Sequence, residues 1–265
     1  MDTPSVLVER SGGVATVTIN RPAAKNAIDP ATTDGLTAAL RGLGADDDVR
    51  AVVLTGAGGD FCAGGDVKGM GEGGERSVEQ RRSAMSRYRQ LAHAFMAIDK
   101  PLIAAIDGVA FGAGLSMALY ADIVLVSTRA RLAMVFHRIG LVPDVGAWFN
   151  LPRVVGLQRA KELIYSAREF GAEEAVRMGL ALETVPPEEL PARAMELARS
   201  FEGASPTAFS LSKRALQASL QNDFDTMLEM EASAQAIAGS SAYVRESIRR
   251  FGAREPAQFR WPKKD

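Results

Sequence analysis

The order of the apolar segments limits the fold most strongly, because strand-like and helix-like segments alternate to about residue 185 and only helix-like segments follow. The β-branched run from Val14 to Ile19 predicts a strand that pairs with residues 5–10 across a Gly12-Gly13 turn. Asp29 before Pro30 predicts the start of a helix. Further strands are predicted over residues 49–55, 102–106, 123–127 and 131–135. This alternation is typical of an α/β layered fold.

The last part of the chain has helical periodicity without strands. A first apolar stripe recurs at helical spacing, and a second follows on a later segment. The stripes consist of Ala194, Leu197, Ala198 and Phe201, and of Met227, Met230, Ala234 and Ile237. We therefore expect a core over residues 1–200 and a helical region over 201–265, whose apolar faces cover the core or meet another subunit.

The amino-acid composition limits the kinds of molecule that the protein is expected to bind. The 265 residues carry 31 basic and 32 acidic side chains, so no general field attracts nucleic acid or an anionic membrane. A single cysteine excludes an internal disulfide, and with only two histidines a zinc site is not expected. No signal pattern and no membrane-spanning apolar run are recognised, so we expect a cytoplasmic protein that acts on a small molecule.

Two glycine-rich turns have a common design. In each, small residues allow a ligand to approach backbone N–H groups, and the second turn also opens a helix, whose N-terminus favours negative charge. The turns are Phe61-Cys62-Ala63-Gly64-Gly65-Asp66 and Gly108-Val109-Ala110-Phe111-Gly112-Ala113-Gly114. Two donors that converge on one oxygen form an oxyanion hole. Each turn can equally be a plain strand-to-helix connection, and neither has the glycine spacing of a dinucleotide-binding fingerprint.

One carboxylate, Asp144, lies in an otherwise almost wholly apolar run from Ile139 to Phe149. A buried carboxylate without a partner is costly, so this position indicates a helix cap, an ion pair or a base kept dry for chemistry. Aspartate is a preferred N-cap residue, and a helix is predicted from Val145 onward.

Several motifs in series resemble the crotonase family, the enoyl-CoA hydratases and isomerases. The resemblance covers nearly the whole chain, from about Val6 to Phe259. The motifs are residues 61–66, Lys100 to Gly108, Gly112-Ala113-Gly114, Gly140-Leu141-Val142-Pro143-Asp144, Asn20-Arg21-Pro22 with Asn26-Ala27, and Leu151-Pro152-Arg153 with Val155-Gly156.

The resemblance implies a superhelix of ββα units followed by helices that build a homotrimer or a dimer of trimers. It implies that the N–H groups of Ala63 and Ala113 hold the thioester oxygen of an acyl-CoA, although the family usually has glycine at the second position. It implies no metal and no cofactor other than the coenzyme A of the substrate. The implied substrate-binding residues are Ala63, Gly64, Gly65, Asp66, Gly112, Ala113, Gly114, Ser116, Phe136 and Trp148.

The two glutamates of the family's hydratases are missing, because the matching positions hold Ser116 and Phe136. The Gly-Leu-Val-Pro-Asp context resembles the isomerases of phenylacetate breakdown and the dienoyl-CoA isomerases. We therefore interpret Asp144 as a single acid–base residue for a double-bond shift, with a pKa raised by Phe136, Val142, Trp148 and Phe149. A hydratase that uses Asp144 and water, and a non-catalytic acyl-CoA-binding protein, remain alternatives.

Other residues are weaker candidates. His137 is more often a structural residue in such a place, and Cys62 has no histidine near it in sequence to activate it. Lys213, Arg249 and Arg250 are candidates for contacts to the CoA phosphates, and the loop from Gly69 to Glu75 is a candidate cover for the acyl chain.

Overall fold

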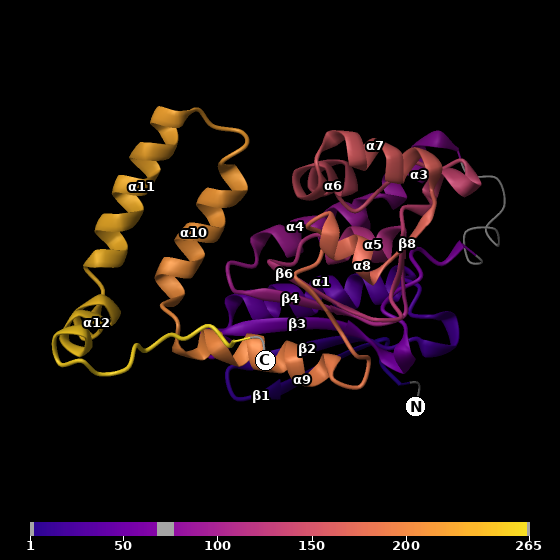
Figure 1. Cartoon of the computed structure of the whole chain (residues 1–265). Helices are drawn as coiled ribbons and strands as arrows, with labels where there is room; N and C mark the ends of the chain where they lie inside the picture. The colour runs from indigo at the N-terminus through magenta and orange to yellow at the C-terminus, as the bar shows by residue number, and fades with distance from the viewer. Residues whose placement is uncertain (1–2, 68–76, 264–265) are drawn as a thin grey trace.

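The computed structural model describes residues 3–67 and 77–263 of the chain. Figure 1 shows a sheet with helices on both faces, from which three C-terminal helices project to one side. The segment from Gly69 to Glu75 lies outside the described residues.

The strands and helices follow one another in the predicted order up to residue 185. The strands are β1 Val6–Ser11, β2 Val14–Ile19, β3 Ala51–Gly56, β4 Leu102–Ile106, β5 Val109–Phe111, β6 Ile123–Ser127, β7 Arg131–Ala133, β8 Glu169–Gly171 and β9 Glu183–Val185. The helices are α1 Pro30–Ala45, α3 Val78–Ala84, α4 Ser86–Ala97, α5 Ala113–Ala118, α6 Ala147–Val155, α7 Leu157–Ser166, α8 Ala172–Arg177, α9 Leu190–Ser200, α10 Pro206–Ala218, α11 Phe224–Gly239 and α12 Ala242–Gly252.

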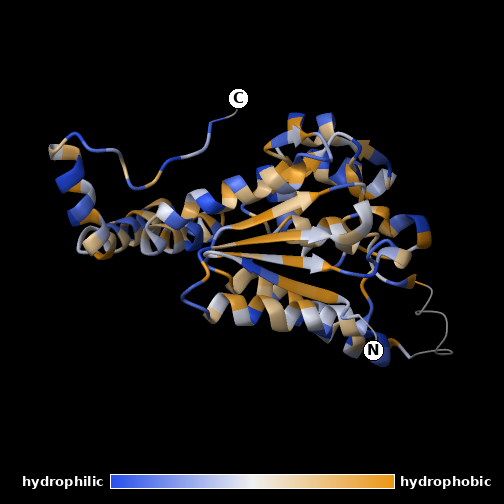
Figure 2. Cartoon of the chain, turned by 90° about the horizontal axis from the view of Figure 1, so that it is seen from below, coloured by the Kyte–Doolittle hydropathy of each residue, from blue (hydrophilic) through white to orange (hydrophobic). Residues whose placement is uncertain are grey.

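The main sheet has the strand order β1-β2-β3-β4-β6-β9, and every pairing after the β1–β2 hairpin is parallel. Its central strands are buried on both faces. On β3, Val52 and Leu54 face one hydrophobic cluster, while Ala51 and Val53 face another. This explains the continuous apolar runs, because alternate side chains of a strand point to opposite faces and each face here is covered by helices (Figure 2).

Helix α9 covers the second face of the sheet. Its predicted stripe is confirmed, since Ala194, Leu197 and Ala198 are fully buried against β3, β4 and β6. On the first face, α1 begins as predicted, with the Asp29 carboxylate accepting a hydrogen bond from the Thr32 N–H at 2.7 Å.

A three-stranded sheet, β5-β7-β8, adjoins the main sheet and carries the second glycine turn into α5. An isolated bridge pairs Cys62 with Ala110 of β5, so the first glycine turn lies directly beside this small sheet. Segments about 50 residues apart in sequence therefore meet at one place.

The N-terminal signature, Asn20-Arg21-Pro22 with Asn26-Ala27, holds the segment that leads into the first glycine turn. Lys25 and Asn26 have left-handed backbones, with φ of 49° and 57°. The Asn26 side chain accepts a hydrogen bond from the Arg21 N–H and donates to the carbonyls of Ala57 and Asp60. Asparagine suits this position because it tolerates the left-handed region and supplies both donor and acceptor.

The C-terminal helices project away from the sheet, and the chain then returns to the body (Figure 1). Phe259 and Trp261 of the returning segment both lie 5.9 Å from the Phe201 ring, measured between centroids. The second predicted stripe lies on α11, where Ile237 is 54% exposed and no described residue is buried. No helix within residues 3–67 and 77–263 is both long and apolar enough to span a membrane.

Candidate active site

The two glycine turns are joined through their backbones. The Cys62 N–H donates to the Val109 carbonyl at 2.8 Å, and the Phe111 N–H donates back to the Cys62 carbonyl at 2.9 Å. A Cβ at Gly114 would lie 2.3 Å from the Cys62 carbonyl oxygen. A Cβ at Gly64, where φ is +102°, would lie 2.9 Å from the Phe111 carbonyl oxygen and 3.6 Å from the Ala113 nitrogen. Both glycines are required by this close approach.

The predicted donor Ala63 is already engaged. Its backbone N–H donates to the Lys25 carbonyl at 2.9 Å, so the expectation that it binds a ligand oxygen does not fit the geometry. The neighbouring Gly65 differs. Its flanking residues Gly64 and Asp66 pair with Ile28, and the Gly65 N–H has no acceptor in the described part of the chain.

The second predicted donor, Ala113, is the first residue of α5. The first N–H groups of a helix have no partner within the helix, and the Ala113 N–H likewise finds no acceptor among residues 3–67 and 77–263. Gly65 in the first turn and Ala113 in the second thus each have an N–H group that is free, among the described residues, to bind a ligand oxygen. Gly65 was expected among the substrate-binding residues but not as the donor, because the pairing with Ile28 decides which N–H of the turn is free.

Asp66 fixes the first turn. Its carboxylate accepts a hydrogen bond from the Arg21 guanidinium at 3.0 Å, and its N–H donates to the Ile28 carbonyl. The carboxylate is therefore held by the N-terminal signature. Asp66, expected among the substrate-binding residues, thus holds the first turn in place.

Asp144 lies on the segment that leads into α6. The helix begins at Ala147, its N-cap residue is Gly146, and no side chain caps it, so the alternative that Asp144 is a helix cap does not hold. The Oδ1 atom is buried without a hydrogen-bond partner among the described residues. Burial raises the pKa of Asp144 from 3.8 to about 7, and a hydrogen bond from its own backbone N–H opposes part of the rise. This carboxyl can therefore both accept and donate a proton near neutral pH.

Tyr88 of α4 was not predicted. Burial raises the pKa of its phenol to about 12, and the charge of Asp144 adds to that rise, followed by the charge of Cys62. Tyr88 packs against the hydrophobic cluster that contains Cys62 and Val145. The sequence carries no signal for it, because a tyrosine on an amphipathic helix is ordinary.

The side chains expected around Asp144 differ in burial. Phe136 is buried, and its ring lies 3.6 Å from the position that a Cβ on Gly112 would take. Ser116 is buried and donates from its hydroxyl to the Gly112 carbonyl at 3.1 Å. Val142 and Trp148 are 57% and 61% exposed, so the prediction that they shield Asp144 is wrong for a single chain.

Two reactive residue types near the site have structural roles. His137 is exposed, and its ring stacks on that of Tyr165. Burial raises the pKa of the Cys62 thiol to about 12, which leaves almost no thiolate at neutral pH. Neither residue has the properties of a nucleophile or general base here.

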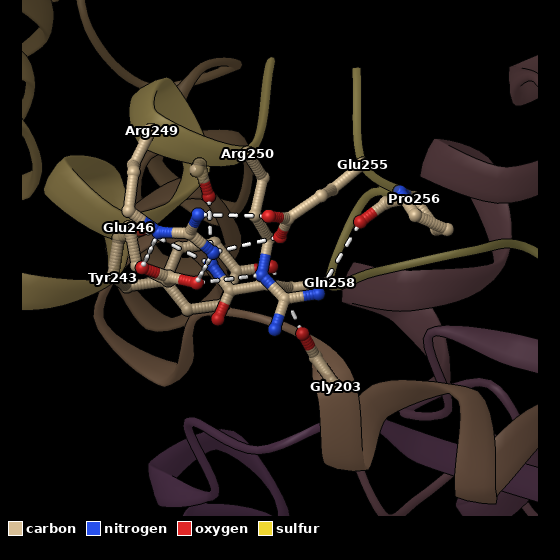
Figure 3. Close-up of polar contacts among 9 residues, drawn as sticks. Gly203, Tyr243, Glu246, Arg249, Arg250, Glu255, Pro256 and Gln258 are labelled. Carbon is tan, nitrogen blue, oxygen red and sulfur yellow. Dashed lines mark hydrogen bonds and ion pairs between the residues drawn. The ribbon is translucent and has the colours of Figure 1, made fainter. Parts of the chain in front are cut away.

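The basic residues considered for CoA phosphates are occupied. Lys213 is buried and binds the Asp122 carboxylate at 2.8 Å and the Lys100 carbonyl at 3.0 Å. Figure 3 shows Arg249 and Arg250 of α12 paired with Glu246, and Arg249 is also paired with Glu255. Within the described residues, no group of three or more histidine, cysteine or acidic side chains could hold a metal ion.

Known proteins match nearly the whole length of the chain. A model of the enoyl-CoA hydratase/isomerase family matches residues 9–263. A Rhodobacter capsulatus protein named "Probable enoyl-CoA hydratase" is 39% identical over 96% of this chain and 97% of its own length. The 1,2-epoxyphenylacetyl-CoA isomerase of Escherichia coli is 35% identical over 93% and 95%.

Solved structures show the same fold. The crystal structure of an enoyl-CoA hydratase/isomerase from Cupriavidus metallidurans superposes with a TM-score of 0.94 at 39% identity, and all of both chains is covered. The predicted crotonase-like α/β fold with a C-terminal helical region is thereby confirmed. The chain belongs to the enoyl-CoA hydratase/isomerase family, the crotonase family.

Proposed function

We propose that this enzyme shifts a double bond in an acyl-CoA, with Asp144 as its single acid–base residue. The observation that carries the proposal is the buried Oδ1 atom of Asp144, which has no partner among the described residues and belongs to a carboxyl with a pKa of about 7. A catalytic group whose pKa is near the working pH can remove a proton and return it with comparable ease.

The N–H groups of Gly65 and Ala113 are the proposed donors to the thioester oxygen. Asp144 takes a proton from the carbon between the thioester and the double bond of a β,γ-unsaturated acyl-CoA. The electrons of that C–H bond move into a dienolate whose oxygen the two donors stabilise. Asp144 then returns the proton two carbons away, which gives the conjugated α,β-unsaturated product.

This reaction conserves both protons and electrons, so it needs no redox cofactor. Coenzyme A enters only as part of the substrate. Arg249 and Arg250 are engaged with glutamates, so we do not assign them to its phosphates.

Hydration of a 2-enoyl-CoA is the second candidate, and the relatives favour it. One relative at 39% identity is named as a hydratase, and the short-chain-enoyl-CoA hydratase of Clostridium acetobutylicum is 37% identical over 88% of this chain. Against hydration, the positions of the two family glutamates hold Ser116 and Phe136, so Asp144 alone would have to activate water and protonate carbon. A protein that binds acyl-CoA without turnover is the third candidate.

Paired substrates separate the three candidates. The purified protein is incubated with a β,γ-enoyl-CoA and, separately, with crotonyl-CoA, and products are resolved by chromatography. We expect the double-bond shift to dominate, and Asp144→Asn to lower its kcat by at least about 10³-fold while acyl-CoA still binds. Dominant conversion of crotonyl-CoA to a hydroxyacyl-CoA supports the hydratase, and binding without turnover supports the third candidate.

A homotrimer, or a dimer of trimers, is proposed to form through the C-terminal helices. Several large apolar side chains on and near α10, α11 and α12 are more than half exposed, as expected of a surface that another subunit covers. They are Leu216, Leu220, Phe224, Ile237, Ile248 and Phe251. Light scattering coupled to gel filtration tests this assembly, and a monomer at micromolar concentration would contradict it.

A further inference from the structure

The backbone just after Asp144 is unusual. Val145 has a φ of 48° and Gly146 a φ of 74°, so two successive residues are left-handed. A β-branched residue in this region is a true outlier, because its Cβ then lies too close to the following carbonyl oxygen. Val145 is also 4% exposed, so contacts within the fold must maintain this conformation.

The Tyr120 phenol is packed directly on this turn. A Cβ on Gly146 would lie 2.0 Å from the Tyr120 hydroxyl oxygen and 3.1 Å from its Cζ atom. Only glycine fits at position 146 while the phenol stays in place. The hydroxyl thus occupies the space beside the turn.

The Tyr120 ring packs against α4, and its backbone comes shortly after the end of α5. Its ring stacks on Phe95 of α4, with centroids 5.1 Å apart and planes 11° from parallel. The Tyr120 N–H donates to the carbonyl of Met117 in α5, the helix that begins with Ala113. The position of Tyr120 is therefore tied to the element that supplies the proposed oxyanion donor.

Asn150 of α6 also contacts the Val145–Gly146 turn. Its backbone N–H donates to the Gly146 carbonyl at 3.0 Å, and its side chain is buried. A Cβ on Gly146 would lie 3.7 Å from the Asn150 Nδ2 atom as well as 2.0 Å from the Tyr120 hydroxyl oxygen, and this Nδ2 atom is buried without a hydrogen-bond partner among the described residues. The hydroxyl lies between the turn and this amide.

We infer that Tyr120 is a positioning residue for Asp144. By filling the space beside Gly146, its hydroxyl holds the left-handed Val145–Gly146 turn, and this turn aims the Asp144 carboxylate into the site. The inference rests on the proposed function in one respect, because it takes Asp144 as the acid–base residue. A purely structural role for Tyr120 would change stability without changing the titration of Asp144.

The first test replaces Tyr120 by phenylalanine, which removes the hydroxyl and keeps the ring stacked on Phe95. We expect kcat to fall about ten-fold with KM changed less than about two-fold, because a small displacement of a catalytic group lowers the rate strongly. We also expect the acid limb of kcat/KM to move to lower pH by about half a unit or more, since a looser Asp144 is better hydrated. Tyr243→Phe is the matched control, because its hydroxyl donates to the Gly203 carbonyl far from Asp144.

The second test changes the contact between Gly146 and the Tyr120 hydroxyl. Gly146→Ala introduces the clash with the hydroxyl, and we expect kcat to fall about 100-fold. In the double variant with Tyr120→Phe the clashing oxygen is gone, so kcat should recover about ten-fold relative to Gly146→Ala alone. Both proteins bear the same cost of alanine at positive φ, so the recovery reports the contact.

The outcomes separate this inference from the proposed function. Unchanged kcat and pH profile in Tyr120→Phe, or no recovery in the double variant, would overturn the role of Tyr120. If Asp144→Asn keeps full activity, the proposed function fails, whatever Tyr120 does. If Gly146→Ala does not fold, the pH profile of Tyr120→Phe decides alone.

Discussion

The two halves of the candidate site are built differently. The glycine turns are fixed by backbone hydrogen bonds, in which Cys62, Ala63 and Asp66 each donate, while the N–H groups of Gly65 and Ala113 have no acceptor among the described residues. The Asp144 segment depends on side chains and on a left-handed valine, and its key oxygen has no partner among the described residues. The difference indicates a division of labour, in which the turns fix the substrate carbonyl and the Asp144 segment moves the proton.

The largest expected effect comes from a substitution in the first glycine turn, which should impair substrate binding as well as the rate. Gly64→Ala forces a Cβ toward the Phe111 carbonyl and the Ala113 nitrogen at a φ of +102°. We expect kcat/KM to fall at least about 100-fold through both kcat and KM, because the turns move apart and the two donors no longer converge. Asp144→Asn should instead lower kcat alone.

Gly179→Ala is the control for this prediction. Gly179 also has a positive φ, of +76°, but nothing lies within 4 Å of the added Cβ. It should destabilise the protein by about 1 kcal/mol and leave kcat/KM unchanged. If both alanine variants lose the same activity, the close approach of the two turns is not what the reaction needs.

A second prediction concerns stability. Because burial raises the pKa of Asp144 to about 7, the fold favours the protonated carboxyl, and this contribution is lost as the pH rises from about 4 through 7. Asp144→Asn stays neutral. It should therefore gain about 1–3 kcal/mol of unfolding free energy relative to the native protein between pH 4.5 and pH 8.

Chemical denaturation of both proteins at the two pH values measures this difference. Asp66→Asn is the comparison variant, because the Arg21 guanidinium holds the Asp66 carboxylate in an ion pair. No gain of stability at pH 8 in Asp144→Asn would show that the Asp144 carboxylate is as well hydrated in the folded protein as in the unfolded chain, and an equal gain in Asp66→Asn would show that the effect is not specific to Asp144.

The smallest expected effect concerns the Arg21–Asp66 ion pair, which holds the first turn in place. Asp66→Asn weakens the ion pair with Arg21, in which both side chains are about one quarter exposed. We expect a loss of about 1 kcal/mol in stability and a two- to five-fold rise in KM with kcat nearly unchanged. A loss of kcat as large as that of Asp144→Asn would place Asp66 in the chemistry instead.

Most of the fold could be predicted because its signals are local or periodic. The run of β4 is apolar at every position, since both sheet faces are covered, and the Asp29–Pro30 pair places the start of α1. The start of α6 was misplaced by two residues, because the left-handed backbone at Val145 cannot be recognised in a residue type that normally avoids it.

The sequence indicates which segments form the site, but it does not indicate which of their atoms act in it. Asp144 stands out in an apolar run, whereas the choice of Gly65 over Ala63 depends on pairing with Ile28 and Lys25, about 40 residues away in sequence. Tyr88 and Tyr120 reach the site through helix packing, which leaves no motif. The exposure of Trp148 could not be foreseen either, because an almost wholly apolar run does not tell which of its side chains face the core.

Proton exchange at the acyl chain tests the central claim most directly. A saturated acyl-CoA that cannot react further is incubated with the enzyme in heavy water, and deuterium at the carbon next to the thioester is followed by NMR across pH 5 to 9. We predict exchange that rises with pH about a midpoint near 7 and disappears in Asp144→Asn. Exchange that persists unchanged in Asp144→Asn would contradict the account, because another group would then be the base.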